Sequence, residues 1–178
     1  MKKTFGFTII ELMMTLLIAF ILIGAGVPAL NDFVSDRSLA SEISRFNIAL
    51  SMARSEAITR GSNVVVCPSA NGTSCVASND WAGGWIVFRD VVGNGSPDLG
   101  DGTCAAASDC VLRFDQGMST GGVLTANANL LSFNRTGERV GGSSTFFKIC
   151  NPKAHQVRNI TIAASGSVSI VSSVGVCP

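Results

Sequence analysis

Hydrophobic residues follow two different periods along this chain, and the change between them divides the molecule. An apolar run leads from Phe7 to Leu30, and Glu11 is its one charged residue. A helix needs roughly 20 apolar residues to cross a bilayer, so the pattern predicts a membrane-spanning helix over residues 7–30. Glu11 is unusual there, because an ionised carboxylate inside hydrocarbon costs on the order of 3 kcal/mol and needs a role or a partner.

The helix is predicted to continue over residues 31–61 with one apolar face. Apolar residues recur there at steps of three and four, which is typical of an amphipathic helix. They are Phe33, Leu39, Ile43, Phe46, Leu50, Ala53 and Ala57. Gly61 supplies the left-handed residue that commonly follows a helix end. Pro28 should kink the helix, so we expect the part before it to protrude and the later stripe to pack on a globular head.

Residues 62–178 change to short β-branched and aromatic runs separated by Gly, Asn, Ser and Asp, which indicates strands and turns. The seven predicted strands are Val64–Cys67, Trp85–Phe88, Val111–Phe114, Leu130–Phe133, Thr145–Ile149, Val157–Ile162 and Val168–Val171, the last two forming a terminal hairpin. The predicted fold is α+β: a long N-terminal membrane-spanning helix, kinked near Pro28, packed on a β-rich and mostly antiparallel head.

The segment before the apolar run is short and contains Lys2 and Lys3. A secretory signal peptide would carry a small-residue cleavage site after its apolar segment, and none is obvious here. Gly6, before the run, is the plausible processing point, because a residue without a Cβ leaves the backbone unhindered. We therefore expect a leader (1–6), a transmembrane helix (7–30), its amphipathic continuation (31–61) and a globular head (62–178).

The cysteines all lie beyond the apolar run, on the side expected to be exported. An even number of cysteines in an exported domain indicates disulfide bonds, and many pairings are possible. Short spacing favours Cys67 with Cys75 and Cys104 with Cys110, which leaves Cys150 to pair with Cys177. No C-x-x-C sequence occurs, so a zinc ribbon or a thioredoxin-like redox site has no support.

Charge is unevenly distributed, although the net charge is only +1. Residues 61–134 carry two Arg against six Asp, whereas residues 135–178 carry five Lys or Arg against Glu138 alone. Such asymmetry can mark a surface for an anionic partner, or two faces of one domain that attract each other. The densest basic cluster consists of Lys148, Lys153, His155 and Arg158.

The beginning of the chain resembles the class III signal of type IV pilins and type II secretion pseudopilins. The resemblance lies in the basic leader, Gly6, the sequence Phe-Thr-Ile-Ile-Glu and the long apolar helix. It implies that a prepilin peptidase cuts between Gly6 and Phe7 and that Phe7 becomes N-methylated. It also implies that Glu11 pairs with the terminal amino group of a neighbouring subunit in a filament, where opposite charges can coexist as a pair.

Motifs in the head are similar to those of the GspH/FimT/FimU group of minor type IV pilins and minor type II secretion pseudopilins. They are Cys67-Pro68, Trp81–Asp90, Phe133–Gly137, Ile149–Asn151, Arg158–Ile160 and Gly166. The resemblance implies a minor pilin, a structural component that joins or primes the tip of a type IV pilus and promotes its assembly. The alternatives are a DNA-binding minor pilin for DNA uptake in natural transformation and a minor pseudopilin of a type II secretion system.

The same resemblance implies partners and a location. The partners are other minor and major pilins, the prepilin peptidase and the inner membrane, with DNA as the partner of the alternative function. A single-pass protein of the bacterial inner membrane would become part of a pilus or pseudopilus in the periplasm and at the cell surface. In FimT-like proteins a similar basic C-terminal region is linked to DNA capture. This chain has only Arg158 where several arginines are expected, and no aromatic residue interleaves with the charges for base stacking.

The sequence gives little support for a catalytic site or a metal site. His155 is the one histidine, and Glu138 is the one carboxylate in the C-terminal third that could orient it, so no enzyme is expected. Asp90, Asn94, Asp98 and Asp101 offer the oxygen atoms that calcium prefers, but their spacing does not match an EF-hand. We expect a solvated acidic turn there, with neither a metal nor a cofactor.

Overall fold

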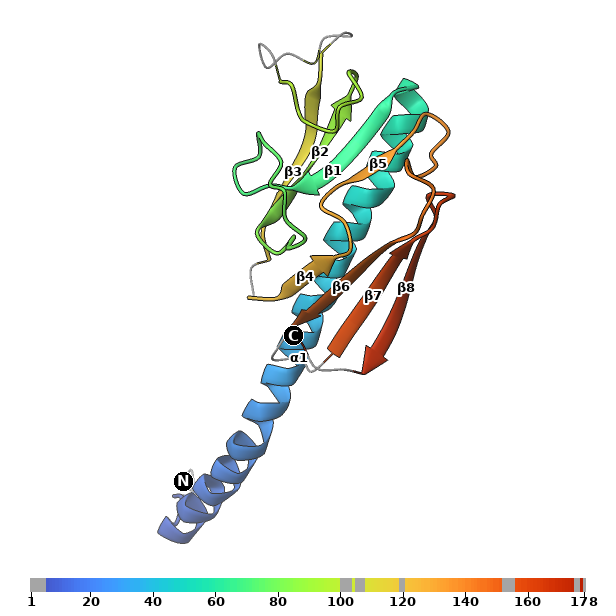
Figure 1. The fold of residues 1–178 in the computed structure, drawn as a ribbon. Helices are drawn as coiled ribbons and strands as arrows, with labels where there is room; N and C mark the ends of the chain where they lie inside the picture. Colours follow the sequence, from blue (N-terminus) through green and yellow to red (C-terminus); the bar gives the residue numbers. More distant parts are fainter. Residues whose placement is uncertain are drawn as a thin grey trace.

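A long helix runs through the molecule and carries the head on its C-terminal half (Figure 1). The computed structural model describes residues 6–99, 104, 108–118, 121–151, 156–174 and 177. Helix α1 extends over Ile9–Arg60. The side chain of Thr8 caps its N-terminus by accepting a hydrogen bond from the Glu11 N–H at 3.3 Å. Gly61 ends the helix in the left-handed conformation, with φ of 63°, which confirms the predicted stop.

The apolar half of α1 departs from one expectation. Within the described residues, no helix is at once long enough and apolar enough to span a membrane. The membrane-spanning character predicted for residues 7–30 is therefore not confirmed. The backbone of α1 is helical without interruption through position 28, so the kink expected near Pro28 stays a prediction.

Beyond Gly61 the described residues form eight strands in two antiparallel four-stranded sheets (Figure 1). The first sheet has the order β3-β2-β1-β5 and the second the order β4-β6-β7-β8. The strands are β1 (Asn63–Pro68), β2 (Gly84–Asp90), β3 (Cys110–Gln116), β4 (Val123–Ala126), β5 (Leu131–Phe133), β6 (Thr145–Asn151), β7 (Gln156–Ile162) and β8 (Val168–Val174). All seven predicted strands and the terminal β7–β8 hairpin are present. Strand β4 was missed, because its apolar run is too short to show a period.

The C-terminal half of α1 packs against both sheets, and Phe46 lies at the centre of this contact. Its ring meets Trp81, Trp85 and Phe147 in edge-on arrangements, with centroid distances of 6.1, 5.0 and 4.9 Å. Such geometry favours aromatic pairs beyond the gain from burial alone. Of the predicted apolar stripe, Phe33 is the exception, because its side chain remains 55% exposed. The packed part of the helix therefore begins after Phe33.

Three disulfide bonds hold segments of the head together. They join Cys67 to Cys75, Cys104 to Cys110 and Cys150 to Cys177, which is the pairing that the spacing favoured. The last bond brings the C-terminal segment back to β6.

Candidate functional site

The first part of α1 presents an apolar surface that the head does not cover (Figure 1). Each large apolar side chain described between Phe7 and Ile23 is more than half exposed, from 51% at Leu16 to 79% at Ile9. They are Phe7, Ile9, Ile10, Leu12, Met13, Met14, Leu16, Leu17, Ile18, Phe20, Ile21, Leu22 and Ile23. A helix that is apolar on every side is stable only when other apolar groups surround it. This segment is therefore the first candidate interaction surface.

Glu11 lies in the first turn of this exposed segment. Its side chain is exposed, and within the described residues no cation pairs with it. Its own N–H donates to Thr8, and a carboxylate in the first turn also interacts favourably with the helix dipole. The spacing Thr8-x-x-Glu11 is that of a capping box, a signal in the sequence that could have identified the helix start. The helix leaves the Glu11 carboxylate available to a partner outside the chain.

Gly6 and Phe7 precede the helix, outside regular secondary structure, and both are exposed. A Cβ built on Gly6 would meet no heavy atom within 4 Å, and Phe7 is 78% exposed. The peptide bond between them is therefore open to an approaching molecule.

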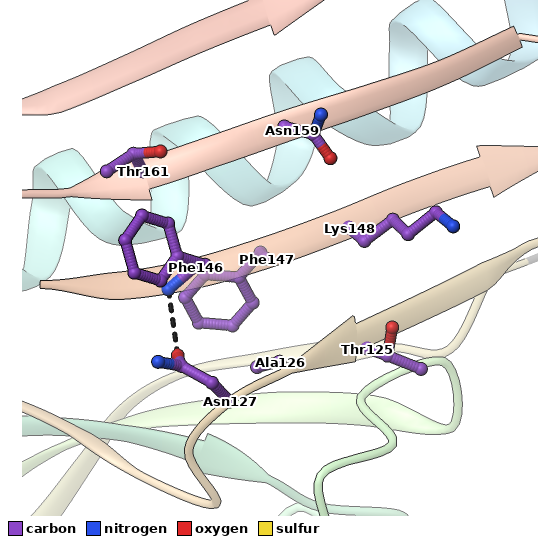
Figure 2. Close-up of a pocket in the computed structure, with 8 residues that line it drawn as sticks. All are labelled: Thr125, Ala126, Asn127, Phe146, Phe147, Lys148, Asn159 and Thr161. Carbon is purple, nitrogen blue, oxygen red and sulfur yellow. Dashed lines mark hydrogen bonds between the residues drawn. The ribbon is translucent and has the colours of Figure 1, made fainter. Parts of the chain in front are cut away.

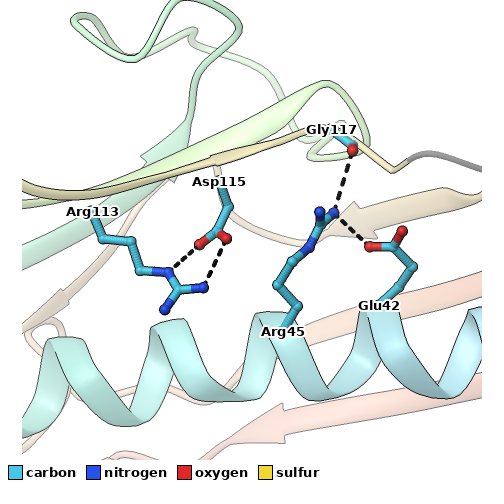
Figure 3. Close-up of polar contacts among 5 residues, drawn as sticks. All are labelled: Glu42, Arg45, Arg113, Asp115 and Gly117. Carbon is cyan, nitrogen blue, oxygen red and sulfur yellow. Dashed lines mark hydrogen bonds and ion pairs between the residues drawn. The ribbon is translucent and has the colours of Figure 1, made fainter.

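A polar contact fixes the base of the head on the helix (Figure 3). Glu42, which is buried, forms an ion pair with Arg45 one turn later, and Arg45 Nη2 also donates to the carbonyl of Gly117 at 3.3 Å. The Arg45 guanidinium stacks on the Trp85 ring, 5.3 Å from its centroid. Sequence reasoning missed this contact, because Glu42 and Arg45 look like an ordinary surface pair until the head covers them.

A second arginine lies beside this contact on β3 (Figure 3). Arg113 makes a two-pronged interaction with Asp115, in which its Nη2 donates to Oδ1 at 2.8 Å. The hydrogen bond to this carboxylate raises the pKa of the Arg113 guanidinium. The pair joins two side chains of the same strand, near the end of β3.

The predicted basic cluster does not form one surface. Lys148 is opposite Asn159 in the β6–β7 register, whereas Arg158 is opposite the buried Ile149. Directly opposed residues share a face and successive residues alternate, so Lys148 and Arg158 lie on opposite faces of the sheet. Lys153 and His155 lie outside the described residues. The two members that the structure describes are therefore divided between two faces, and DNA binding by the cluster stays a prediction.

Lys148 instead borders a shallow groove on the outer face of the second sheet (Figure 2). The groove has a volume of about 480 Å³ and is lined by Thr125, Ala126, Asn127, Phe146, Phe147, Lys148, Asn159 and Thr161. Phe146 is 54% exposed there, and its backbone N–H donates to the Asn127 side chain at 2.8 Å. An exposed aromatic ring therefore accompanies Lys148 on this face, which corrects the expectation that no aromatic residue interleaves with the basic charges.

The acidic loop after β2 also differs from expectation. Asp90 is buried and accepts hydrogen bonds from the N–H groups of Gly93 and Gly95, at 2.6 and 3.0 Å. Asp109 is buried as well and accepts from Val91 and Asp98. Both carboxylates hold the backbone of the loop, so the expected solvated turn is wrong for Asp90, whereas Asn94 and Asp98 are exposed.

The remaining candidates do not converge. Asn94 donates to Asp98 at 2.6 Å, while Asp101 lies outside the described residues, as does His155. Glu138 accepts hydrogen bonds from Thr136 and Asn134 within its own turn. In the parts of the chain that the structure describes, no group of three His, Cys, Asp or Glu residues is arranged to hold a metal ion.

Comparison with known proteins places these features in a family. The sequence model described as type II transport protein GspH matches residues 42–166. The chain is similar to the type IV minor pilin FimU of Pseudomonas aeruginosa in two crystal forms, with 22% identity in each. The TM-scores are 0.58 and 0.52, and the matches cover 78% and 76% of this chain and 92% and 91% of FimU. This similarity concerns the fold.

A more distant similarity is to the minor pseudopilin EpsH from the type 2 secretion system of Vibrio cholerae. It has 13% identity and a TM-score of 0.46, and it covers 78% of this chain and 96% of EpsH. The chain matches no curated protein sequence.

Proposed function

We propose that this chain, which belongs to the GspH family of minor pilins and pseudopilins, is a minor pilin that joins or primes the tip of a type IV pilus and promotes its assembly. In this role it is a structural component and not an enzyme. The observation that carries the proposal is the division of α1 into two halves. Its C-terminal half buries one face against its own head, while the part from Ile9 to Ile23 is exposed on every side.

The exposed half explains why the protein would assemble. Burying one large aliphatic or aromatic side chain contributes about 1.5–3 kcal/mol relative to leaving it in water, so this segment is stable only in a membrane or among the helices of other subunits. Helices that pack in parallel bring their N-termini into apolar surroundings. A terminal amino group there needs an anion, and Glu11, which is exposed and pairs with no cation among the described residues, would supply it. Other minor and major pilins are therefore the proposed partners.

Processing and membrane anchoring form an earlier stage of the same proposal. The exposed bond between Gly6 and Phe7 is the proposed cleavage site of a prepilin peptidase, and Phe7 the proposed methylated N-terminus. Before assembly the apolar segment would rest in the inner membrane, with Lys2 and Lys3 on the cytoplasmic side. Assembly then exchanges lipid contacts for contacts with other helices.

A deletion of the gene, complemented by variants, tests the proposal. We expect the deletion strain to lose surface pili, and the wild-type chain to restore them and to be present in sheared filaments. A Gly6→Leu variant should remain in the membrane at full length and restore nothing. If pili are unaffected and secretion of type II substrates is lost, the pseudopilin alternative replaces the pilus proposal.

DNA binding is a second candidate, and the groove on the outer sheet face favours it. Phe146 offers a ring on which a base can stack, and Lys148 offers a charge for a phosphate. A single such pair supports only weak binding, which is why pilus assembly is the first proposal. Electrophoretic mobility of single-stranded DNA with the full-length protein in detergent, at increasing salt, tests this alternative.

A further inference from the structure

The two sheets have four edge strands, and three of them are protected. Strand β3 carries the charged pair Arg113 and Asp115, and its register with β2 shifts between Val87 and Phe88. Strand β5 is only three residues long, and next to it Val140 N–H donates to the Ser132 carbonyl at 2.8 Å. Charges, irregular register and short length are the devices by which proteins prevent edge strands from pairing with other chains.

Strand β4 is protected by a neighbouring segment. The Trp81 N–H donates to the Leu124 carbonyl at 2.7 Å, and the Ala126 N–H donates to the Asn79 carbonyl at 2.9 Å. The backbone groups on its outer side are therefore paired.

Strand β8 has none of these protections. It is seven residues long, and all seven pair with β7 in one unbroken register. Its sequence Val-Ser-Ile-Val-Ser-Ser-Val contains neither a charge nor a proline, and residues 169–172 are all exposed. It is the last strand of its sheet, with no strand on its other side among the described residues. Its outward N–H and C=O groups thus form a regular row that can pair with another strand.

The inner face of the sheet is also incomplete at this edge. Phe147 is opposite Ile160, and Ile160 is opposite Ile170, so the three side chains form one row across β6, β7 and β8. Phe147 and Ile160 are buried, whereas Ile170 is 41% exposed. On the other face Val171 is 57% exposed. The core row therefore ends in an aliphatic side chain that one further strand would cover.

Neither the C-terminal end of this chain nor a second copy is a good candidate for that strand. Cys177 is bonded to Cys150 on β6, which β7 separates from β8. A second copy could pair its β8 antiparallel with this one, but the two-fold axis would be perpendicular to the sheet. It would point the two α1 helices in opposite directions, and a filament of parallel helices does not allow that.

We propose that β8 accepts an extended segment of a different subunit of the filament, which adds a strand to the second sheet. Main-chain hydrogen bonds supply the attraction, and alternate side chains supply the selectivity. The segment carries an aliphatic residue opposite Ile170 and an uncharged, β-branched or apolar residue opposite Val171. This inference rests on the proposed function, since it takes the partner from the same filament.

Photo-cross-linking in assembled filaments tests the contact directly. The full-length protein carries a benzophenone amino acid at Val171, or at Thr125 as the control. Thr125 lies on the same sheet face, at the protected edge. We expect an adduct with another pilin subunit from Val171 and none from Thr125. The cross-linked peptide, identified by mass spectrometry, should have uncharged residues at alternate positions.

Charge substitution tests the consequence for assembly. Val171→Lys should lower the amount of protein in sheared filaments at least about fivefold, because a lysine on an edge strand blocks pairing. Thr161→Lys places the same charge on the outer face of β7, which is an interior strand. This variant should lower the amount of protein in sheared filaments less than about twofold. Both positions are at least partly exposed, so both variants should keep the wild-type melting temperature.

The outcomes separate this inference from the proposed function. If the wild-type chain is absent from filaments, the proposed function fails, and the partner named here fails with it. If the chain enters filaments but Val171 yields no adduct, or cross-links only to a second copy, the β8 inference is wrong while the proposed function stands. Equal incorporation of both lysine variants into filaments would also overturn the β8 inference.

Discussion

Arg54 of α1 donates from its Nε to the backbone carbonyl of Gly137 at 2.9 Å, and this contact joins the helix to the far end of the head. The Nη2 of the same guanidinium donates to the carbonyl of Ser165 at 3.0 Å. One side chain therefore connects the helix to the β5–β6 loop and to the β7–β8 turn. Both loops contain residues of the head motifs named above, Phe133–Gly137 and Gly166, and the contact gives those residues a structural role.

Arg54→Ala should lower the free energy of unfolding by about 2 kcal/mol or more, because a hydrogen bond to a charged group contributes about 1.5–3 kcal/mol. Denaturant unfolding of the full-length protein in detergent, with disulfides intact, measures the loss. Arg60→Ala is the matched control, since Arg60 makes only an exposed ion pair with Glu56 on the same helix. That variant should change stability by less than about 1 kcal/mol. Equal losses in the two variants would contradict the role assigned to Arg54.

Gly166→Ala should destabilise the head more than Gly142→Ala. Both glycines have positive φ, 76° and 69°, so both substitutions strain the backbone. A Cβ on Gly166 would also lie 2.0 Å from the Gly137 carbonyl oxygen, whereas one on Gly142 meets nothing within 4 Å. The backbone strain alone costs about 1–2 kcal/mol. Melting temperatures of the two variants measure the difference, and equal values would show that the β7–β8 turn moves away without cost.

Phe46→Ala should cost about 3–5 kcal/mol, because it removes a fully buried ring and leaves a cavity between Trp81, Trp85 and Phe147. Phe33→Ala is the control on the same helix and the same predicted stripe. Since Phe33 is 55% exposed, its loss should change head stability by about 0.5 kcal/mol or less. Chemical unfolding followed by tryptophan fluorescence reports on both. Similar costs would mean that the head packs further down the helix than the structure shows.

Glu11→Ala should leave the protein in the membrane but reduce its incorporation into filaments, because the amino group of a neighbouring subunit would be buried without an anion. The cap should survive, since the Glu11 backbone N–H is the donor to Thr8. Thr8→Ala gives the opposite control: it weakens the helix start by about 1 kcal/mol and keeps the carboxylate. Immunoblots of membrane and sheared-filament fractions compare the two. Normal incorporation of Glu11→Ala would exclude the charge pair.

DNA binding by the head, the alternative function, should depend on Lys148 and Phe146 and not on Arg158. The first two share the outer groove, while Arg158 lies on the opposite face of the sheet. Binding should be weak, with Kd about 10⁻⁴–10⁻⁶ M, and should decline as salt rises. Mobility shifts of single-stranded DNA with Lys148→Ala and Arg158→Ala measure the difference. A larger loss for Arg158→Ala would place the DNA surface elsewhere.

Local patterns in the sequence were sufficient to predict the helix and seven of the eight strands described. The three- and four-residue spacing after Asn31 identified the helix, Gly61 its end, and β-branched runs seven of the strands, because each of these signals depends on neighbours in the chain. The short spacings of Cys67 with Cys75 and Cys104 with Cys110 pointed to their bonds, which left the third. Strand β4 was missed, because a run of four residues is too short to show a period, and its partners are distant in sequence.

Only the tertiary structure decided which residues act together. Lys148 and Arg158 are close in sequence, yet the β6–β7 register places them on opposite faces of the sheet. A shift of this register by one residue would have placed both side chains on the same face. Sheet order alone made β8 an open edge and β7 an interior strand, although both read as similar apolar runs. Phe33 and Phe46 were assigned to one stripe, but thirteen residues separate them, about 220° around a helix of 3.6 residues per turn, and only Phe46 is buried by the head. Periodicity predicts that a face will be buried, and the placement of the sheets determines how far along the helix this burial extends.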